Sequence, residues 1–377
     1  MKKILENSFR LFQKALYKAL YCYYRTFSHN KPKLTPEEAR LYLESAHPSL
    51  QLTVRANNHI DVQVDLMIII PTYNSEEFIN ICIESVLMQE TKYSYKVVVV
   101  NDGSTDGTAD ILRNHSDNDK LEVIHQENRG QASARNRALE KIIGKYIMFV
   151  DADDKLPQYS IENLMNKAFE ADAEIVEGNF TTFTAKGKIT IYNKHHNTIE
   201  ADSPLTLQLR GFAWGKVFRA ELFSVIKFPI GNKFEDTIMA LLIYPLTNNC
   251  YTIKDIVYEY FRNPKGITST VRGTLNMIDT YWVTDFLLKE QDYYRVESNQ
   301  LTYTRFLKQI VVNHGRIATL KDKKIQECVF VLSREWFKKK YADKSFDSAG
   351  NYRALQNAFW KNNFNKYDYL LKGFRLI

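Results

Sequence analysis

Short apolar runs alternate with helix-like segments in the first half of the chain. The runs Leu66–Ile70 and Val97–Val100 stop at polar, turn-forming residues, and each precedes apolar positions at helical spacing. A third unit has a strand at Leu121–His125 and a helix at Gln131–Ile143, and a further strand follows at Tyr146–Val150. This alternation predicts an α/β domain with a mostly parallel sheet flanked by helices, in which ligands bind at the carboxyl ends of the strands.

The rest of the chain divides into segments that differ in charge, proline content and hydrophobic periodicity. Residues 1–33 form a basic arm, and 34–64 form a proline-containing linker with a short helix begun by a Thr35 cap. The α/β domain is assigned to 65–275, and a C-terminal helical region to 276–377. Helical periodicity in that region covers Met277–Lys289, Leu301–Leu320 and Lys324–Tyr341. We therefore expect one large α/β domain with a helical appendage, which 377 residues are enough to build.

The arm carries the whole charge excess of the chain. Residues 1–33 contain eight Lys or Arg residues and one Glu, which accounts for the net charge of +7. Because its apolar residues recur at helical spacing, the arm is predicted to be an amphipathic helix that binds an anionic membrane surface. A helix packed against the rest of the protein, with its charged face in water, fits the same pattern.

Cysteine usage and hydropathy bear on the compartment. The four cysteines are widely spaced without a CxxC pair, so neither a zinc site nor a disulfide framework is indicated. No apolar run approaches the roughly 20 residues that span a bilayer, and the start lacks the apolar stretch of a signal peptide. We therefore expect a cytoplasmic protein, peripheral on the cytosolic face of the inner membrane. The phosphate-loop and dinucleotide glycine patterns are absent, which disfavours ATP hydrolysis and NAD chemistry.

Three carboxylates follow the strand Tyr146–Val150 directly, at Asp151, Asp153 and Asp154. Carboxylates clustered at a sheet edge repel one another, and a hard cation such as Mg²⁺ or Mn²⁺ relieves the repulsion. Asp-rich turns also occur for local hydrogen bonding alone. We interpret the cluster as a metal site that holds phosphate. Asp153 is the preferred metal ligand, and Asp151 helps to orient the ribose or the metal. Asp154 is left with a capping role.

Five motifs, this cluster among them, occur in the order seen in glycosyltransferase family 2. They are Pro71-Thr-Tyr-Asn-Ser-Glu76, Asn101-Asp-Gly-Ser-Thr-Asp-Gly107, Asn128-Arg-Gly-Gln-Ala-Ser-Ala-Arg-Asn136, Asp151-Ala-Asp-Asp154 and Phe234-Glu-Asp236. The chain resembles that family over residues 65–270. The resemblance implies a GT-A (Rossmann-like) fold, a nucleotide-sugar donor, a divalent metal (Mg or Mn) held by a DXD motif, and inversion at the anomeric carbon.

The resemblance also implies a set of donor-binding residues. Tyr73 offers an aromatic face to the base, and Asp102 accepts a hydrogen bond from a uracil-type N–H. Without a ligand, these two residues would only complete turns. Arg135 can pair with a carboxylate or a phosphate in bidentate fashion, whereas Arg129 and Arg137 are expected in solvent. The full donor set is Pro71, Thr72, Tyr73, Glu76, Asp102, Arg135, Asp151 and Arg262, the last before a Gly266–Ser269 loop that in relatives closes over the diphosphate.

Single displacement needs a carboxylate across the sugar from the diphosphate, to take the proton of the acceptor hydroxyl. The resemblance implies Asp236 as this general base, supported by Glu235. Asp236 can also cap the helix expected at Ile238–Leu242, and the two roles are compatible. Trp214 and Lys216 are assigned to the acceptor, the first stacking on a sugar ring and the second meeting an anionic group. Packing of Trp214 in the core is the open alternative.

The resemblance thus implies a metal-dependent glycosyltransferase that moves a sugar, from a UDP-sugar on family grounds, to a hydroxyl of a glycan or lipid-linked acceptor. The expected setting is synthesis of a bacterial-type surface polysaccharide such as capsule or lipopolysaccharide. A sugar nucleotidyltransferase is the alternative enzyme, but it would carry a Gly- and Arg-rich loop in place of Pro71-Thr-Tyr-Asn74. A basic nucleic-acid-binding protein is the non-enzymatic alternative. The neutral remainder of the chain argues against it, so no nucleic-acid partner is expected.

Overall fold

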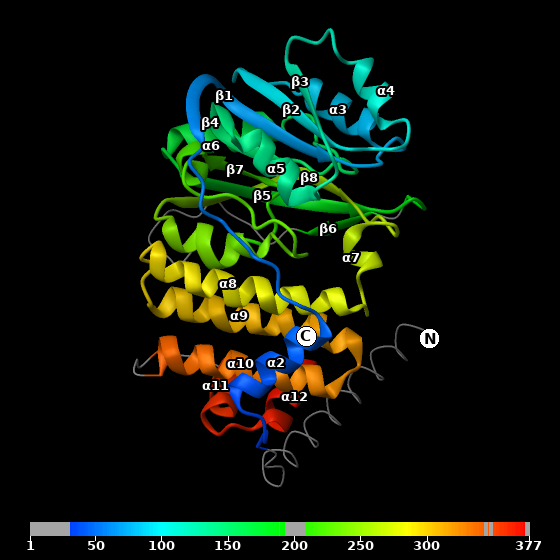
Figure 1. The fold of residues 1–377 in the computed structure, drawn as a ribbon. Helices are drawn as coiled ribbons and strands as arrows, with labels where there is room; N and C mark the ends of the chain where they lie inside the picture. The colour runs from blue at the N-terminus through cyan, green and yellow to red at the C-terminus, as the bar shows by residue number, and fades with distance from the viewer. Residues whose placement is uncertain (1–30, 188, 193–207, 343–345, 347–349, 374–377) are drawn as a thin grey trace, which may run out of the picture. The chain divides into compact units, whose positions relative to one another are not determined.

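The structure is a computed structural model that describes residues 31–187, 189–192, 208–342, 346 and 350–373 (Figure 1). Most of the basic arm therefore lies outside the described residues. The chain forms two compact units, and each is treated by itself below. The α/β unit comprises Leu50–Thr270 and Val283–Val296, and the helical unit comprises Met1–Ser49, Val271–Trp282 and Glu297–Ile377.

Four parallel strands form the first half of the sheet in the α/β unit, in the order β3-β2-β1-β4 (Figure 1). Their bounds are β1 His59–Thr72, β2 Tyr95–Asp102, β3 Leu121–Gln126 and β4 Lys141–Phe149. The helices between them are α3 Ile79–Leu87, α4 Thr108–Arg113 and α5 Gln131–Leu139. The parallel strand and helix alternation predicted from the sequence is confirmed.

The second half of the sheet is mixed. Strand β7 (Lys216–Arg219) runs antiparallel to both β4 and β5 (Ile175–Phe183), and β8 (Cys250–Phe261) runs parallel to β5. Strand β6 (Thr190–Tyr192) pairs with β5, and the whole is an eight-stranded sheet. The remaining elements of this unit are α6 Ser160–Glu170, η2 Ala220–Phe223, η3 Met239–Ile243, η4 Tyr244–Leu246 and α7 Ile267–Thr270.

The apolar strands explain why both faces of the sheet are covered. Side chains alternate between the two faces of a strand, so a fully apolar strand needs packing on both sides. Leu66, Ile68 and Ile70 of β1 join one core with residues of α3 and α6. The other face packs against α5, which contacts β1, β2 and β4.

Two boundaries differ from the sequence prediction. Helix α5 ends at Leu139, and Ile142 and Ile143 belong to β4 rather than to the helix. These β-branched side chains suit a buried strand, and β4 pairs with β1 from Lys141 onward. Strand β1 begins at His59, before the expected start at Leu66.

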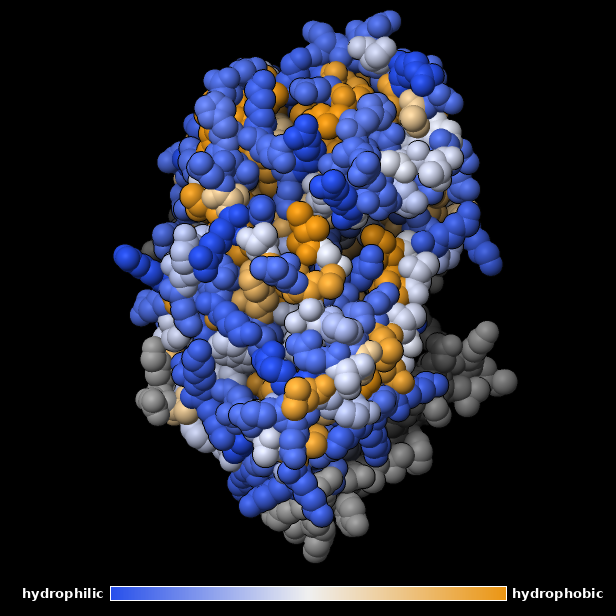
Figure 2. All heavy atoms as spheres, viewed as in Figure 1, coloured by the Kyte–Doolittle hydropathy of each residue, from blue (hydrophilic) through white to orange (hydrophobic). Residues whose placement is uncertain are grey.

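The helical unit confirms the helices expected in the C-terminal region. Their bounds are η5 Leu275–Ile278, α8 Asp279–Tyr293, α9 Gln300–Ile317, η6 Ala318–Leu320, α10 Lys323–Tyr341, α11 Gly350–Trp360 and α12 Phe364–Gly373, and α8 continues into the α/β unit. Helix α2 (Pro36–Ala46) packs on α10 and starts with the expected Thr35 cap, a capping box with Glu38. In the described residues no helix meets the length and hydropathy needed to cross a membrane. Polar side chains dominate the face seen in Figure 2.

Candidate active site

The carboxyl ends of β1, β2 and β4 bring three of the predicted motifs to one edge of the sheet. Thr72 and Asp102 are the last residues of β1 and β2, and Asp151 follows β4 after one residue. Since the three strands are parallel neighbours, their ends lie side by side. The edge therefore gathers side chains that are distant in the sequence.

Arg135 on α5 links the carboxylate cluster to the predicted base motif. One guanidinium nitrogen donates to Oδ1 of Asp151 and the other to Oε1 of Glu235, each at 2.8 Å. The guanidinium also lies over the rings of Phe149 and Phe228. Burial disfavours its charge, but Asp151, Glu235 and Asp236 together raise the pKa of Arg135. The structure thus gives Arg135 two carboxylate partners, and direct contact with the donor stays a prediction.

Asp153 and Asp154 have different environments. Asp153 accepts a hydrogen bond from Asn263, which follows β8, at 2.9 Å. Asp154 has no exposed surface and accepts from the Tyr258 hydroxyl at 2.8 Å and the Phe261 backbone N–H at 2.7 Å. The Tyr258 hydroxyl in turn accepts from the backbone N–H of Asp151. Asp154 therefore ties the carboxylate turn to β8, rather than only capping the next segment.

Burial and crowding raise the pKa of two of the three carboxylates, Asp153 and Asp154. Burial raises the pKa of Asp153, and the charge of Asp151 adds to the effect against the opposing hydrogen bond from Asn263. Burial together with Asp151 and Asp153 raises the pKa of Asp154 well above its ordinary value. Positive charge placed beside Asp153 would relieve this repulsion, because opposite charge favours the ionised form.

Asp102 organises the loop between β3 and α5. Its two carboxylate oxygens accept from the Gln126 side chain at 2.6 Å and from the backbone N–H groups of Arg129 and Gly130 at 2.9 and 2.7 Å. Gly103 has φ +71°, and a Cβ there would lie 2.7 Å from the backbone nitrogen of Asn128. The close approach of these two loops explains a glycine at this point of the motif.

The loop after β1 is held by the loop after β2. The Asn74 backbone N–H donates to Ser104, and the Glu76 carboxylate accepts from the Gly107 backbone N–H at 2.6 Å. Tyr73 is about half exposed, so its ring is accessible to a ligand. Pro71 and Thr72 are buried within β1, and the Thr72 hydroxyl has no hydrogen-bond partner among the described residues. An orphaned hydroxyl at a sheet edge is compatible with a polar ligand there.

The Glu235-Asp236 motif begins a short helical segment. Phe234 has a positive φ of 69°, Thr237 and Ile238 are helical, and the buried π-helix η3 follows from Met239. The backbone oxygen of Asp236 accepts from the Met239 N–H at 2.9 Å. A helical segment after Asp236 is thus confirmed, while the role of Asp236 as base stays a prediction.

The structure buries both residues assigned to the acceptor. The Trp214 indole stacks between Phe212 and Tyr258, with ring centroids 3.7 and 4.5 Å away. The Lys216 side chain has no exposed surface and forms a 2.8 Å ion pair with Glu177. This geometry favours the core-packing alternative for Trp214 and a structural role for Lys216. Acceptor contact by either residue stays a prediction.

Arg262 directly follows β8, next to Phe261, whose backbone bonds the carboxylate turn at Asp154. Its side chain is exposed and donates to the hydroxyl of Tyr192 in β6. The segment that follows contains the helical turn α7 (Ile267–Thr270) where the sequence predicted a loop. Arg262 therefore remains accessible, and its contact with a diphosphate is a prediction.

Several polar residues of the site were not singled out from the sequence. Gln131 donates to Oδ1 of Asp151 at 2.9 Å, Asn263 binds Asp153, and Gln126 binds Asp102. A signal existed for Gln131, because it lies four residues before Arg135 and thus on the same face of α5. Arg129 and Arg137 were expected in solvent, and both side chains are at least half exposed.

A divalent metal is compatible with this carboxylate edge. The described residues contain no group of three or more His, Cys, Asp or Glu side chains placed to hold a metal by themselves. Mg²⁺ is commonly held by one or two carboxylates together with substrate phosphates. Asp153 and Asp151 supply oxygen ligands of that kind, and burial together with the charge of Asp151 raises the pKa of Asp153.

Comparison with known proteins decides the family. The sequence model described as Glycosyl transferase family 2 matches residues 67–233. Residues 67–233 belong to glycosyl transferase family 2. Relatives include glycosyltransferase GlyA of Streptococcus pneumoniae, 34% identical over 55% of this chain and 32% of GlyA. Glycosyltransferase GlyG of the same organism is 28% identical over 54% of this chain and 73% of GlyG.

Another relative is named for teichoic acid. The teichoic acid poly(glycerol phosphate) polymerase of Staphylococcus epidermidis is 41% identical over 31% of this chain and 17% of that protein. This chain spans about a third of the length of GlyA. The crystal structure of S. aureus TarS residues 1–349 in complex with UDP-GlcNAc superposes with a TM-score of 0.52 at 18% identity. It covers 82% of this chain and 91% of that one, and the shared fold is GT-A.

Proposed function

We propose that this protein transfers a sugar from a nucleotide-sugar, with UDP as the nucleotide, to a hydroxyl group of a glycan or lipid-linked acceptor. The observation that carries the proposal is the bridge by Arg135 between Asp151 and Glu235, both at 2.8 Å. The bridge joins a carboxylate turn suited to a metal diphosphate with a motif suited to a general base. A site that must hold a leaving group and activate an attacking hydroxyl needs both parts close together.

The donor side uses the sheet edge. The half-exposed ring of Tyr73 stacks on the base, and Asp102 and the loop that it holds border the base and ribose. Asp153 and Asp151 would hold a divalent cation, which when bound neutralises the diphosphate as negative charge develops on it. Arg262 approaches the same phosphates from the end of β8. Support comes from the exposed guanidinium of Arg262 and the unpartnered hydroxyl of Thr72.

The chemical step is a single displacement. Asp236 takes the proton of the acceptor hydroxyl, the oxygen bonds to the anomeric carbon, and the bond to the β-phosphate oxygen breaks with inversion. Glu235 acts as a positioning residue, because its bond to Arg135 fixes the segment that carries Asp236. The proposed setting is bacterial cell-surface polysaccharide synthesis, in line with relatives named for wall polymers.

A panel of nucleotide-sugars tests the proposal. With Mn²⁺ or Mg²⁺, one or more UDP-sugars should raise the unfolding temperature and be slowly hydrolysed to UDP, and excess EDTA should abolish both effects. Lack of stabilisation by every nucleotide-sugar would overturn the proposal. Release of pyrophosphate from UTP and a sugar 1-phosphate would instead indicate a nucleotidyltransferase. NMR of the product's anomeric proton tests inversion.

A further inference from the structure

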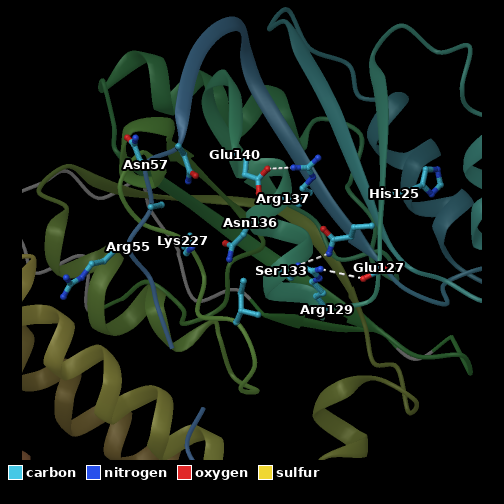
Figure 3. Close-up of a pocket in the computed structure, with 14 residues that line it drawn as sticks. Arg55, Asn57, His125, Glu127, Arg129, Ser133, Asn136, Arg137, Glu140 and Lys227 are labelled. Carbon is cyan, nitrogen blue, oxygen red and sulfur yellow. Dashed lines mark hydrogen bonds and ion pairs between the residues drawn. The ribbon is translucent and has the colours of Figure 1, made fainter. Parts of the chain in front are cut away.

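A second polar groove lies beside α5 in the α/β unit. Its volume is about 770 Å³, within the roughly 300–1,000 Å³ typical of ligand pockets. Four segments line it: the chain before β1, the end of β3 with the following loop, helix α5 with Glu140, and the chain from Lys227 to Ile230 (Figure 3). All of them belong to the α/β unit.

The groove and the candidate active site occupy different faces of α5. Gln131 and Arg135, four residues apart, point to Asp151. Ser133, Asn136 and Arg137 line the groove instead, and helical geometry turns them away from the first pair. Helix α5 therefore forms a wall of both, and Gln126, which lines the groove and bonds Asp102, lies where the groove adjoins the donor side of the site.

One chain segment leads from the groove to the predicted base. Lys227 and Ile230 line the groove, and Glu235 five residues later bonds Arg135. Asn136 fastens the start of this segment, since its amide both donates to and accepts from the backbone of Phe228 at 2.8 Å. A ligand in the groove would thus contact the same segment that carries Asp236.

The charges in the groove favour an anionic ligand. Four cationic side chains but only two carboxylates line it. Arg129 pairs with Glu127, Arg137 pairs with Glu140, and Arg55 is held by Glu290. Within the described residues, no carboxylate pairs with the half-buried Lys227 ammonium. A partly desolvated cation without a counter-charge gains from an anionic partner.

The lining also argues for recognition through charge and amide groups. None of the described residues in the lining is Phe, Tyr or Trp, so stacking on a sugar ring is not available there. Asn57, Asn136 and Ser133 supply hydrogen-bonding groups to the lining (Figure 3), and so does Gln126. The ligand class that matches these features is a hydroxyl-rich chain with acidic groups.

We propose that this groove binds the anionic part of the acceptor glycan, with a carboxylate or phosphodiester group of the acceptor bonded to Lys227. The inference rests on the proposed function, because it assigns the groove to the acceptor of that reaction. Arg129 and Arg137 flank the bound anion, and the groove holds acceptor units remote from the hydroxyl that reacts.

Calorimetry with the whole protein tests the groove directly. The probes are an oligogalacturonate, a glycerol phosphate oligomer, a neutral malto-oligosaccharide of matched length, and inorganic phosphate. At least one acidic oligomer should bind, and the pair of acidic probes tells carboxylate from phosphodiester. Binding should weaken with added salt because charge carries it. The neutral oligomer should not bind, and binding by phosphate alone would reduce the groove to a site for a free ion and overturn the proposal.

Variants locate the binding. Lys227→Gln should lower the affinity for the acidic probe roughly tenfold or more, which corresponds to about 1.4 kcal/mol or above in binding free energy. Lys254→Gln, an exposed lysine of β8 outside the groove, should bind like the wild type. Arg129→Gln provides a second test if Lys227→Gln does not fold, since the Arg129 side chain is mostly exposed. Equal affinity in the folded groove variants and the wild type would overturn the proposal.

Two further titrations separate this proposal from the proposed function. The acidic probe should still bind when UDP saturates the protein. Displacement by UDP would place the probe in the donor site and contradict its assignment to the groove. Binding of UDP by the wild type is measured on its own. Failure of UDP to bind would count against the donor site, whereas loss of probe binding in Lys227→Gln concerns only the groove.

Discussion

Replacing Arg135 with methionine removes the guanidinium that bonds Asp151 and Glu235 and leaves an apolar side chain against Phe149 and Phe228. Both carboxylates then lose their counter-charge in a largely buried site. Breaking a buried ion pair by removing one partner costs about 3–5 kcal/mol. Because the carboxylate side chains keep 20% and 16% exposure, water compensates part of this loss, and we expect a cost of about 3 kcal/mol.

Native-state hydrogen exchange of β1 and β4 measures this change in the α/β unit alone, as the free energy that opens the central sheet. Arg137→Met is the matched control, two residues along α5. Its ion pair with Glu140 is about half exposed and should be worth no more than about 1 kcal/mol. Adding Glu235→Gln to Arg135→Met should recover part of the stability. A loss below about 1 kcal/mol for Arg135→Met, equal to the control, would refute the bridge as a central contact.

Further substitutions probe the other parts of the site. Asp153→Asn should abolish metal-dependent turnover, and unchanged turnover by this variant would refute the metal assignment. Asp236→Asn should keep donor affinity in calorimetry but lower the chemical rate by roughly 10²- to 10⁴-fold; lost donor binding would instead move Asp236 to the donor site. Tyr258→Phe removes the hydroxyl between Asp151 and Asp154 and should cost about 1–3 kcal/mol in the same exchange experiment, since it leaves buried polar groups unsatisfied. Deleting residues 1–33 should release the protein from vesicles of anionic lipid yet spare donor hydrolysis. Equal co-sedimentation of the full chain and the deletion variant would argue against membrane binding by the arm.

The sequence predicts the sheet edge well because its evidence is local. Apolar runs end in polar motifs, and parallel strands bring those ends together. Thr72, Asp102 and Asp151 therefore meet as expected. The end of α5 was misplaced, because Ile142 and Ile143 fit either a helix or a buried strand until their pairing with β1 is known.

Side-chain partners across long sequence separations could not be predicted in this way. Arg135 lies 100 residues from Glu235, and Asp153 lies 110 residues from Asn263. Lys216 looked suited to an anionic ligand, but Glu177 on the adjacent strand β5 supplies the charge inside the core. Motif spacing identifies which groups reach an edge, whereas tertiary packing decides which of them face a ligand.

Titration of UDP into the wild type and into Asp153→Asn, with Mn²⁺ or with EDTA, tests whether Asp153 takes part in metal-dependent binding of the diphosphate. The wild type should bind UDP tightly only with Mn²⁺, and Asp153→Asn should lose most of this metal-dependent gain. Thermal unfolding of the variant serves as the check on its fold. Equal UDP affinity in all four combinations, with metal removal verified, would contradict a metal diphosphate site at the edge formed by Asp151 and Asp153.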